Sequence, residues 1–233
     1  MTDQRILLVE GESDKDFCQQ LICTLKLDVT IEPETPRSLC QQAESDGIDV
    51  LRIDVLRIIA LPFALTRLSK KQITHLAVIV DADSSAQGYG FLKRRAQITA
   101  LLEQHGYIIP VLQNPLNQGE IFLHTKAGIP SVGLWIMPTH GTDGMLEDLL
   151  LDNLGNPAQQ SLLNKADTAI NELGDLRTFK DTHLSKARLS TLLAWQRKPG
   201  MSAGKAYQAK VFDTNPDTST IIPFTTWLTR VFQ

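Results

Sequence analysis

Residues 5–14 read Arg-Ile-Leu-Leu-Val-Glu-Gly-Glu-Ser-Asp, and this stretch decides how the chain is expected to fold. Its first half is a short and nearly continuous apolar run, which is typical of a strand buried on both faces of a parallel sheet. The polar residues from Glu10 onward break the run, and Ser13 can cap a helix whose first turn favours acidic residues. The stretch therefore predicts a strand followed at once by a helix from about Asp14 to Lys26.

The same alternation of strand and helix continues to about residue 151. Apolar runs at 75–80 and 132–137 predict two more strands, and helical patterns follow at 91–105, with a basic start, and at 144–151. Weaker candidates for strands are 28–32, 107–112 and 121–124. The alternation favours an α/β fold in which a mostly parallel, Rossmann-like sheet is flanked by helices.

The remaining regions are predicted to be helical. Residues 37–70 hold a tandem of two Ile-Asp-Val-Leu-Arg copies, and Pro62 is expected to kink or end the helix there. Beyond Gly155, helical patterns occupy residues 158–173, 180–196, 202–209 and 223–232. The sequence thus predicts an α/β domain over residues 1–155 and a helical extension over residues 156–233 that packs on it. Thr142 or Asp143 is the expected cap of the helix that ends the α/β part.

Acidic residues stand where the predicted strands end. Glu10 follows the first strand, Asp81 and Asp83 follow the strand at 75–80, and Glu147 lies one loop beyond the strand at 132–137. Ligands of open α/β sheets bind beyond the carboxyl ends of the strands, so the fold would gather these residues at one edge. Alternate strand residues point the same way, so Asp81 and Asp83 are expected to approach one ion together. Mg²⁺ takes oxygen ligands and relieves the repulsion between crowded carboxylates.

Two motifs resemble those of TOPRIM domains. The stretch Leu7-Leu-Val-Glu-Gly-Glu-Ser-Asp14, with Phe17 after it, is similar to the first TOPRIM motif, and Val78-Ile-Val-Asp-Ala-Asp83 is similar to the second. The segment from Gly133 to Asp148 further resembles a group of small bacterial proteins related to the TOPRIM domains of the overcoming-lysogenisation-defect nucleases. The resemblance covers about residues 5–151 and implies a TOPRIM-like fold.

The resemblance also implies a function and a site. It implies a Mg²⁺-dependent nuclease, with Mn²⁺ as a substitute, that hydrolyses phosphodiester bonds of DNA or RNA. Glu10, Asp81 and Asp83 would be the catalytic residues and would bind metal together with Asp14 and Glu147. One or two ions would be held, and Asp14 and Glu147 would complete the second site in the two-ion case. The late acidic position is assigned to Glu147 rather than to its neighbour Asp148.

Other members of the superfamily fit the chain less well. Topoisomerases need a separate domain with a tyrosine nucleophile, for which 233 residues are too few. Primases carry a zinc-binding module, which Cys18, Cys23 and Cys40 do not provide because they lack paired ligand spacing.

Two alternatives to a nuclease remain open. TOPRIM-like domains that have lost catalysis serve as binding or scaffold modules. The related nucleases carry a fused ATPase domain, so this chain is alternatively a subunit that works with a separate ATPase in a defence or mobile-element system. The net charge of −3 argues against strong non-specific binding to nucleic acid, although residues 160–233 are net basic.

The bulk composition indicates an ordinary globular protein. Hydrophobic residues make up 42% and charged residues 21%. Charged side chains interrupt the apolar stretch 51–68, so no membrane span is expected, and three cysteines without a leader-like N-terminus favour a cytoplasmic protein. His140, Lys186 and Arg188 are expected to be solvated, and the three tryptophans are expected in the core.

Overall fold

The computed structural model describes residues 4–33, 56–113, 115–215 and 219–233. Its strands form one sheet in the order β2-β1-β3-β5-β4. Neighbouring strands run parallel except β4, which is antiparallel to β5. The strands are β1 (Arg5–Val9), β2 (Thr30–Pro33), β3 (His75–Asp81), β4 (Glu120–Phe122) and β5 (Val132–Met137). The mostly parallel, Rossmann-like α/β fold predicted from the sequence is therefore confirmed.

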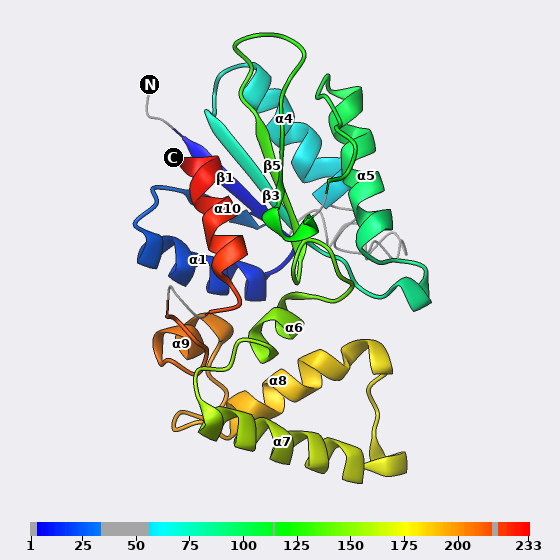
Figure 1. The fold of residues 1–233 in the computed structure, drawn as a ribbon, viewed down its shortest axis with the longest axis vertical. Coiled ribbons are helices and arrows are strands. Elements are labelled where there is room, and N and C mark those ends of the chain that lie inside the picture. Colours follow the sequence, from blue (N-terminus) through cyan, green and yellow to red (C-terminus); the bar gives the residue numbers. More distant parts are fainter. Residues whose placement is uncertain (1–3, 34–55, 114, 216–218) are drawn as a thin grey trace, which may run out of the picture.

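Helices cover both faces of the sheet (Figure 1). Helices α1 (Glu12–Leu25) and α10 (Ile222–Phe232) lie on one face, and α4 (Leu61–Ser69) and α5 (Phe91–Gln104) lie on the other. A π-helical turn, Leu56–Ala60, leads into α4. Short 3₁₀ turns occupy Ser85–Gln87, Leu116–Gln118, Gly174–Leu176 and Asp181–His183.

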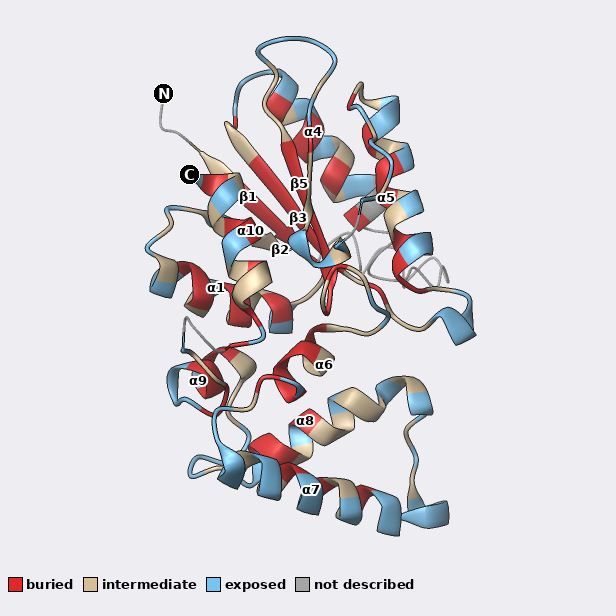
Figure 2. Ribbon diagram, in the orientation of Figure 1, coloured by how far each residue is buried: buried red, intermediate tan, exposed pale blue. Residues whose placement is uncertain are grey.

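Successive residues of each central strand are buried on opposite faces, as the pleat of a strand requires. In β3, Ala77 and Ile79 join the hydrophobic cluster under α1 and α10, whereas Val78 and Val80 join the one under α4 and α5. Figure 2 shows β1, β3 and β5 buried along most of their length. Burial on both faces explains why these strands are unbroken apolar runs in the sequence.

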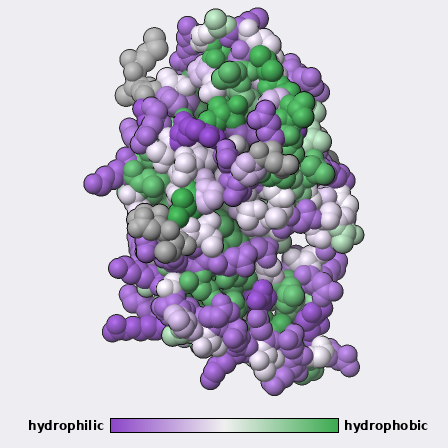
Figure 3. All heavy atoms as spheres, viewed as in Figure 1, coloured by the Kyte–Doolittle hydropathy of each residue, from purple (hydrophilic) through white to green (hydrophobic). Residues whose placement is uncertain are grey.

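The C-terminal helices are α6 (Leu146–Leu151), α7 (Pro157–Glu172), α8 (Leu184–Ala194) and α9 (Ala203–Gln208). Leu163, Ala166 and Ile170 form the buried stripe of α7, which faces α8, and its other side is solvated. Figure 3 shows hydrophilic side chains prevailing over this lower part of the molecule. Buried residues of α6 to α10 belong to one hydrophobic cluster with β1, β3 and β5. The C-terminal helices thus share a core with the sheet, and the division at residue 155 stays a prediction.

One predicted strand, one helix cap and one helix end differ from the prediction, each because of the residues in its own segment. Residues 107–112 form no strand, only an isolated bridge between Tyr107 and His124, since Pro110 has no N–H to donate and Val111 is exposed. Gly11 rather than Ser13 is the N-cap of α1. The helix does not end at Pro62, because this proline falls in the first turn of α4, where its missing N–H is not needed.

Other expectations concern particular side chains. Trp135 and Trp227 lie in the core as predicted, but Trp195 is 45% exposed. Cys18 and Cys23 are free thiols. The predicted helix and the tandem between residues 37 and 55, with Cys40, lie outside the described residues. In the part of the chain that the structure describes, no helix is long and apolar enough to cross a bilayer.

Helix α9 packs against α1 at very short range. Gly204 donates its N–H to the Asp16 carboxylate at 2.6 Å, and a Cβ atom at this position would lie 2.5 Å from the backbone oxygen of Asp16. We expect Gly204→Ala to destabilise the protein by about 1–3 kcal/mol, although alanine favours a helix, because the clash is with backbone. Urea unfolding measures the effect, and an unchanged or raised midpoint would contradict the close packing.

Candidate active site at the carboxyl edge of the sheet

The site is built where β1 and β3 end. These strands are parallel neighbours, so Glu10, just after β1, and Asp81, the last residue of β3, lie at the same edge. The backbone N–H of Asp81 donates to Glu10 Oε1 at 3.3 Å, although the two residues are 71 positions apart. The sheet topology thus brings the two predicted motifs together.

Two helices close this edge. Asp14 lies in the first turn of α1 and is 8% exposed, and Glu147 lies in the first turn of α6. The N–H of Leu146 donates to Asp81 Oδ1 at 3.0 Å, which fixes the start of α6 against the end of β3. Both helices therefore direct their amino ends, where negative charge is favourable, towards the acidic residues.

Burial and mutual repulsion raise the pKa values of these carboxyl groups. Burial, reinforced by the charge of Asp14, raises the pKa of Glu10 to about 8, with Arg94 opposing the shift. Burial, reinforced by Glu147, raises the pKa of Asp14 to about 6. The pKa of Asp81 is raised well above its usual range by burial and then by the charges of Asp14, Glu10 and Glu147. The shifts show that these carboxyl groups are close enough to interact.

Asp83 is held differently from Asp81. It lies beyond the end of β3, has a left-handed backbone with φ of 58°, and exchanges backbone hydrogen bonds with Gly144. Its carboxylate forms an ion pair with Arg94, which is 3% exposed. The expectation that Asp81 and Asp83 point the same way as alternate residues of one strand is therefore wrong. Asp83 nevertheless interacts electrostatically with Glu10, Asp81 and Glu147.

Sequence reasoning missed the role of Arg94. It lies in the first turn of α5, stacks over Tyr89 at 4.5 Å, and its Nε has no hydrogen-bond partner. A positively charged residue near the amino end of a helix is unfavourable because of the helix dipole. Its presence there could have indicated that Arg94 pairs with an acidic residue.

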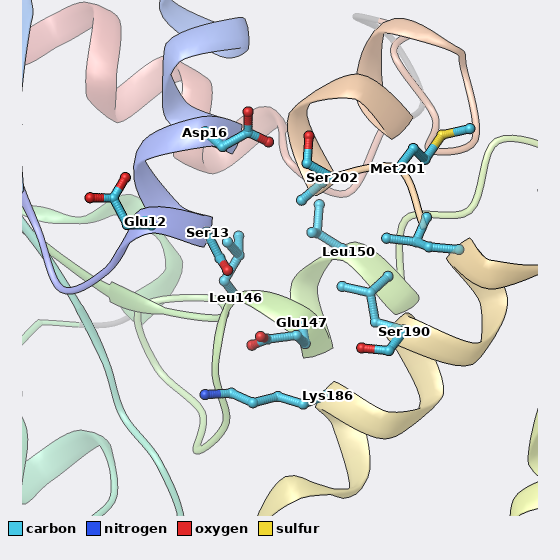
Figure 4. Close-up of a pocket in the computed structure, with 13 residues that line it drawn as sticks. Glu12, Ser13, Asp16, Leu146, Glu147, Leu150, Lys186, Ser190, Met201 and Ser202 are labelled. Carbon is cyan, nitrogen blue, oxygen red and sulfur yellow. The ribbon is translucent and has the colours of Figure 1, made fainter. Parts of the chain in front are cut away.

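Lys186 supplies a second positive charge. It projects from α8 towards Glu147 (Figure 4). The pKa of Glu147 is raised by burial, and Lys186 opposes that shift. Lys186 is exposed as expected, yet it faces the acidic site rather than bulk solvent alone. Arg188, by contrast, pairs with Asp167 at 2.7 Å on α7.

The neighbouring acids have structural roles. Asp148 accepts the N–H of Met145 at 2.8 Å and also contacts Ser185, so it holds the start of α6. Asp143 is not the cap of α6, because it accepts the N–H groups of Ser85 at 2.8 Å and Phe91 at 3.0 Å. The choice of Glu147 over Asp148 as a candidate site residue is consistent with this arrangement.

His140 was expected in solvent and is instead 1% exposed. Its Nδ1 accepts the N–H of Ile136 at 3.0 Å, and its Nε2 lies 3.3 Å from Glu120. The ring packs against Phe91 and Trp135. His140 therefore belongs to the buried structure beside β4 and β5.

The acidic residues do not yet form a coordination sphere. Across the described ranges, no three His, Cys, Asp or Glu side chains are disposed to hold a metal ion as they stand. Asp83 is engaged by Arg94, and Asp81 and Glu10 each accept a backbone N–H. The site is thus a cluster of buried carboxyl groups that raise one another's pKa values and that Arg94 and Lys186 only partly offset.

The fold and the site define a Rossmann-like α/β protein with an acidic cluster at the carboxyl edge of its sheet. The chain belongs to the family described as "Protein of unknown function (DUF3226)", whose model matches residues 4–233. The match runs through both the sheet and the C-terminal helices. Comparisons with curated proteins and with solved structures gave no match.

The raised pKa values predict how stability depends on pH without a cation. The folded protein holds protons on Glu10 up to about pH 8 and on Asp14 up to about pH 6, whereas the unfolded chain releases them near 4.5 and 3.8. Stability contributed by these groups is complete below the unfolded values and is lost as the pH rises through the folded values. We expect the melting temperature in EDTA to fall between pH 5 and 8.

The control for this prediction removes one titrating group. Glu10→Gln should flatten the fall, and Glu103→Gln, at an exposed position of α5, should leave it unchanged. A melting temperature that rises over this range in EDTA would contradict the burial of the cluster.

Proposed function

We propose that the protein is a TOPRIM-like, Mg²⁺-dependent nuclease that hydrolyses phosphodiester bonds of DNA or RNA. The observation that carries the proposal is the cluster of interacting carboxyl groups at the carboxyl edge of the sheet, in the positions of the two TOPRIM-like motifs. Buried acids that raise one another's pKa cost stability, and perturbed groups of this kind mark functional sites. A binding site for a divalent cation explains why they are kept together.

The donor set suits magnesium or manganese. Every candidate ligand is a carboxylate oxygen, which is the donor that these hard cations prefer. Glu10, Asp81 and Asp83 would hold one ion, and Asp14 and Glu147 would complete the site. When bound, the cation supplies Lewis-acid polarisation of the phosphoryl oxygens and neutralises charge that develops during the displacement.

Groups of the protein would transfer protons, orient the carboxylates and offset charge. Glu10 would bind the metal or act as the general acid or base at the leaving or attacking oxygen. Asp81 is oriented by the N–H of Leu146, and Asp83 by Arg94. Lys186 places a positive charge beside Glu147, which partly offsets the negative charge of the acidic site.

A second candidate function is binding without catalysis. It is favoured by the ion pair between Arg94 and Asp83, which neutralises one carboxylate by protein alone. In this case the domain serves as a nucleic-acid or protein scaffold, or as a subunit of a system with a separate ATPase. A cytoplasmic location goes with either function as part of the proposal.

Nicking of supercoiled plasmid, with single-stranded DNA and RNA as parallel substrates, tests the nuclease. We expect cleavage with Mg²⁺ or Mn²⁺ and none with EDTA. Calorimetry of Mg²⁺ binding at pH 7 in buffers of different ionisation enthalpy tests the site separately, because an incoming cation must displace protons from Glu10. Proton release without cleavage would favour the binding module, and the absence of both would remove the support for a metal site.

A further inference from the structure

A pocket of about 350 Å³ lies beside the acidic cluster, between the start of α1, α6, α8 and the segment that enters α9 (Figure 4). This volume falls within the range of small-molecule sites, which are concave and mostly apolar. Its apolar walls are formed by Leu146, Leu150, Leu189, Leu193, Met201 and Ala203, and polar or charged residues complete the lining. Four of these side chains are leucines that are at least nine-tenths buried, so the walls are part of the packed structure.

The charges around the pocket exclude an isolated anion. Glu12, Asp16 and Glu147 are acidic residues of the lining, and among the described residues that line the pocket Lys186 is the one basic residue. A free phosphate would be repelled by this balance, whereas an uncharged group meets apolar walls. The pocket therefore suits the neutral part of a ligand.

Three serines, Ser13, Ser190 and Ser202, give the pocket a polar edge. Ser190 projects from α8, and Ser202 precedes α9. The Ser202 hydroxyl is buried and has no hydrogen-bond partner. The exposed hydroxyls of Ser13 and Ser190 are therefore the groups that can form hydrogen bonds with a ligand at this edge.

Glu147 connects the pocket with the acidic site. Its side chain lines the pocket, and its charge contributes to the raised pKa values of Asp14 and Asp81. A group seated in the pocket is therefore one side chain away from the carboxyl cluster. A ligand that spans both has an uncharged, largely apolar part joined to a phosphate.

We propose that this pocket takes a nucleobase of the strand whose phosphodiester bond is cut at the acidic cluster. The inference rests on the proposed function and names its substrate class as unpaired nucleic acid. A nucleobase combines apolar faces with polar edge atoms, which matches leucine walls and serine hydroxyls. A base inside a duplex is stacked and paired, so it would have to leave the helix to reach the pocket.

Binding of nucleosides in EDTA tests the pocket without involving metal or phosphate. Adenosine and cytidine are titrated by NMR against wild type, Ser190→Phe and the matched control Ala194→Phe. Ser190 lines the pocket, whereas Ala194 lies one turn further along α8, and both positions are exposed. We expect saturable binding that Ser190→Phe weakens at least 10-fold, Ser190→Leu weakens less, and Ala194→Phe leaves unchanged. Ribose alone and toluene, added as further probes, should bind at least 10-fold more weakly than the nucleosides.

The outcomes separate this inference from the nuclease itself. Absent nucleoside binding, equal binding to Ser190→Phe and wild type, or equally strong binding of toluene would overturn the pocket assignment even if the protein cuts DNA. Specific nucleoside binding without any cleavage would support the assignment of the pocket to a nucleobase and would contradict the proposed nuclease activity. In an active enzyme, single strands should be cut at least 10-fold faster than the matching duplex, and Ser190→Phe should abolish that preference.

Discussion

Replacing Asp81 with asparagine is expected to abolish metal-dependent cleavage and, at the same time, to stabilise the metal-free protein. Asparagine keeps the oxygen that accepts the N–H of Leu146, so the start of α6 stays in place. It removes an ionisable group whose charged form is opposed by burial and by the neighbouring carboxylates. We expect a loss of activity on the order of 10²–10³-fold, as for removal of a principal charge-stabilising group.

Two measurements on Asp81→Asn separate these effects. Cleavage rates are compared with those of Asp175→Asn, an exposed position in the connection between α7 and α8. Melting in EDTA at pH 8 should show a rise of roughly 2–4 °C for each 1 kcal/mol gained. An inactive variant that is less stable than wild type would indicate disrupted structure. Near-wild-type cleavage would remove Asp81 from the mechanism.

The largest effect on stability is expected from Trp227→Ala. Trp227 is fully buried in α10, lies against Trp135 and Phe224, and donates its indole N–H to the backbone oxygen of Glu120 at 3.1 Å. Its removal leaves a cavity between α10 and β5 and an unpaired carbonyl. We expect a loss of about 3–5 kcal/mol, which corresponds to a melting temperature lower by roughly 6–20 °C.

The chain provides a matched control for this substitution. Trp195, at the end of α8, is 45% exposed, so Trp195→Ala should change the melting temperature little. Equal effects of the two substitutions would mean that α10 does not contribute to the core as described.

The strands and the central acids were predictable because each depends on a local pattern. The unbroken apolar runs of β1, β3 and β5 follow from burial on both faces, and the parallel order of the strands then places Glu10 and Asp81 at one edge. The late acid Glu147 was also predictable, since α6 begins one loop beyond β5. These inferences need only periodicity and the general rule for α/β sheets.

What could not be predicted depends on contacts between distant segments. The left-handed backbone of Asp83 follows from its pairing with Gly144, and the burial of His140 follows from its packing against Trp135 and Phe91. The use of Asp143 at the start of α5 rather than α6 likewise required the folded arrangement. The pocket beside Glu147 is formed by four segments, and no sequence pattern within a single segment predicts it.

The helix that completes one face of the sheet is the last to be made. Proteins fold from their amino end as they leave the ribosome, so β1, β3 and β5 can pair once residue 137 has emerged. At that stage Trp135 lacks its contacts with Phe224 and Trp227, because these residues of α10 are translated only after α6 to α9. During that interval the nascent chain presents an apolar surface to the cell. Ribosome-associated chaperones are therefore expected to bind this protein before α10 is synthesised and to leave once it docks.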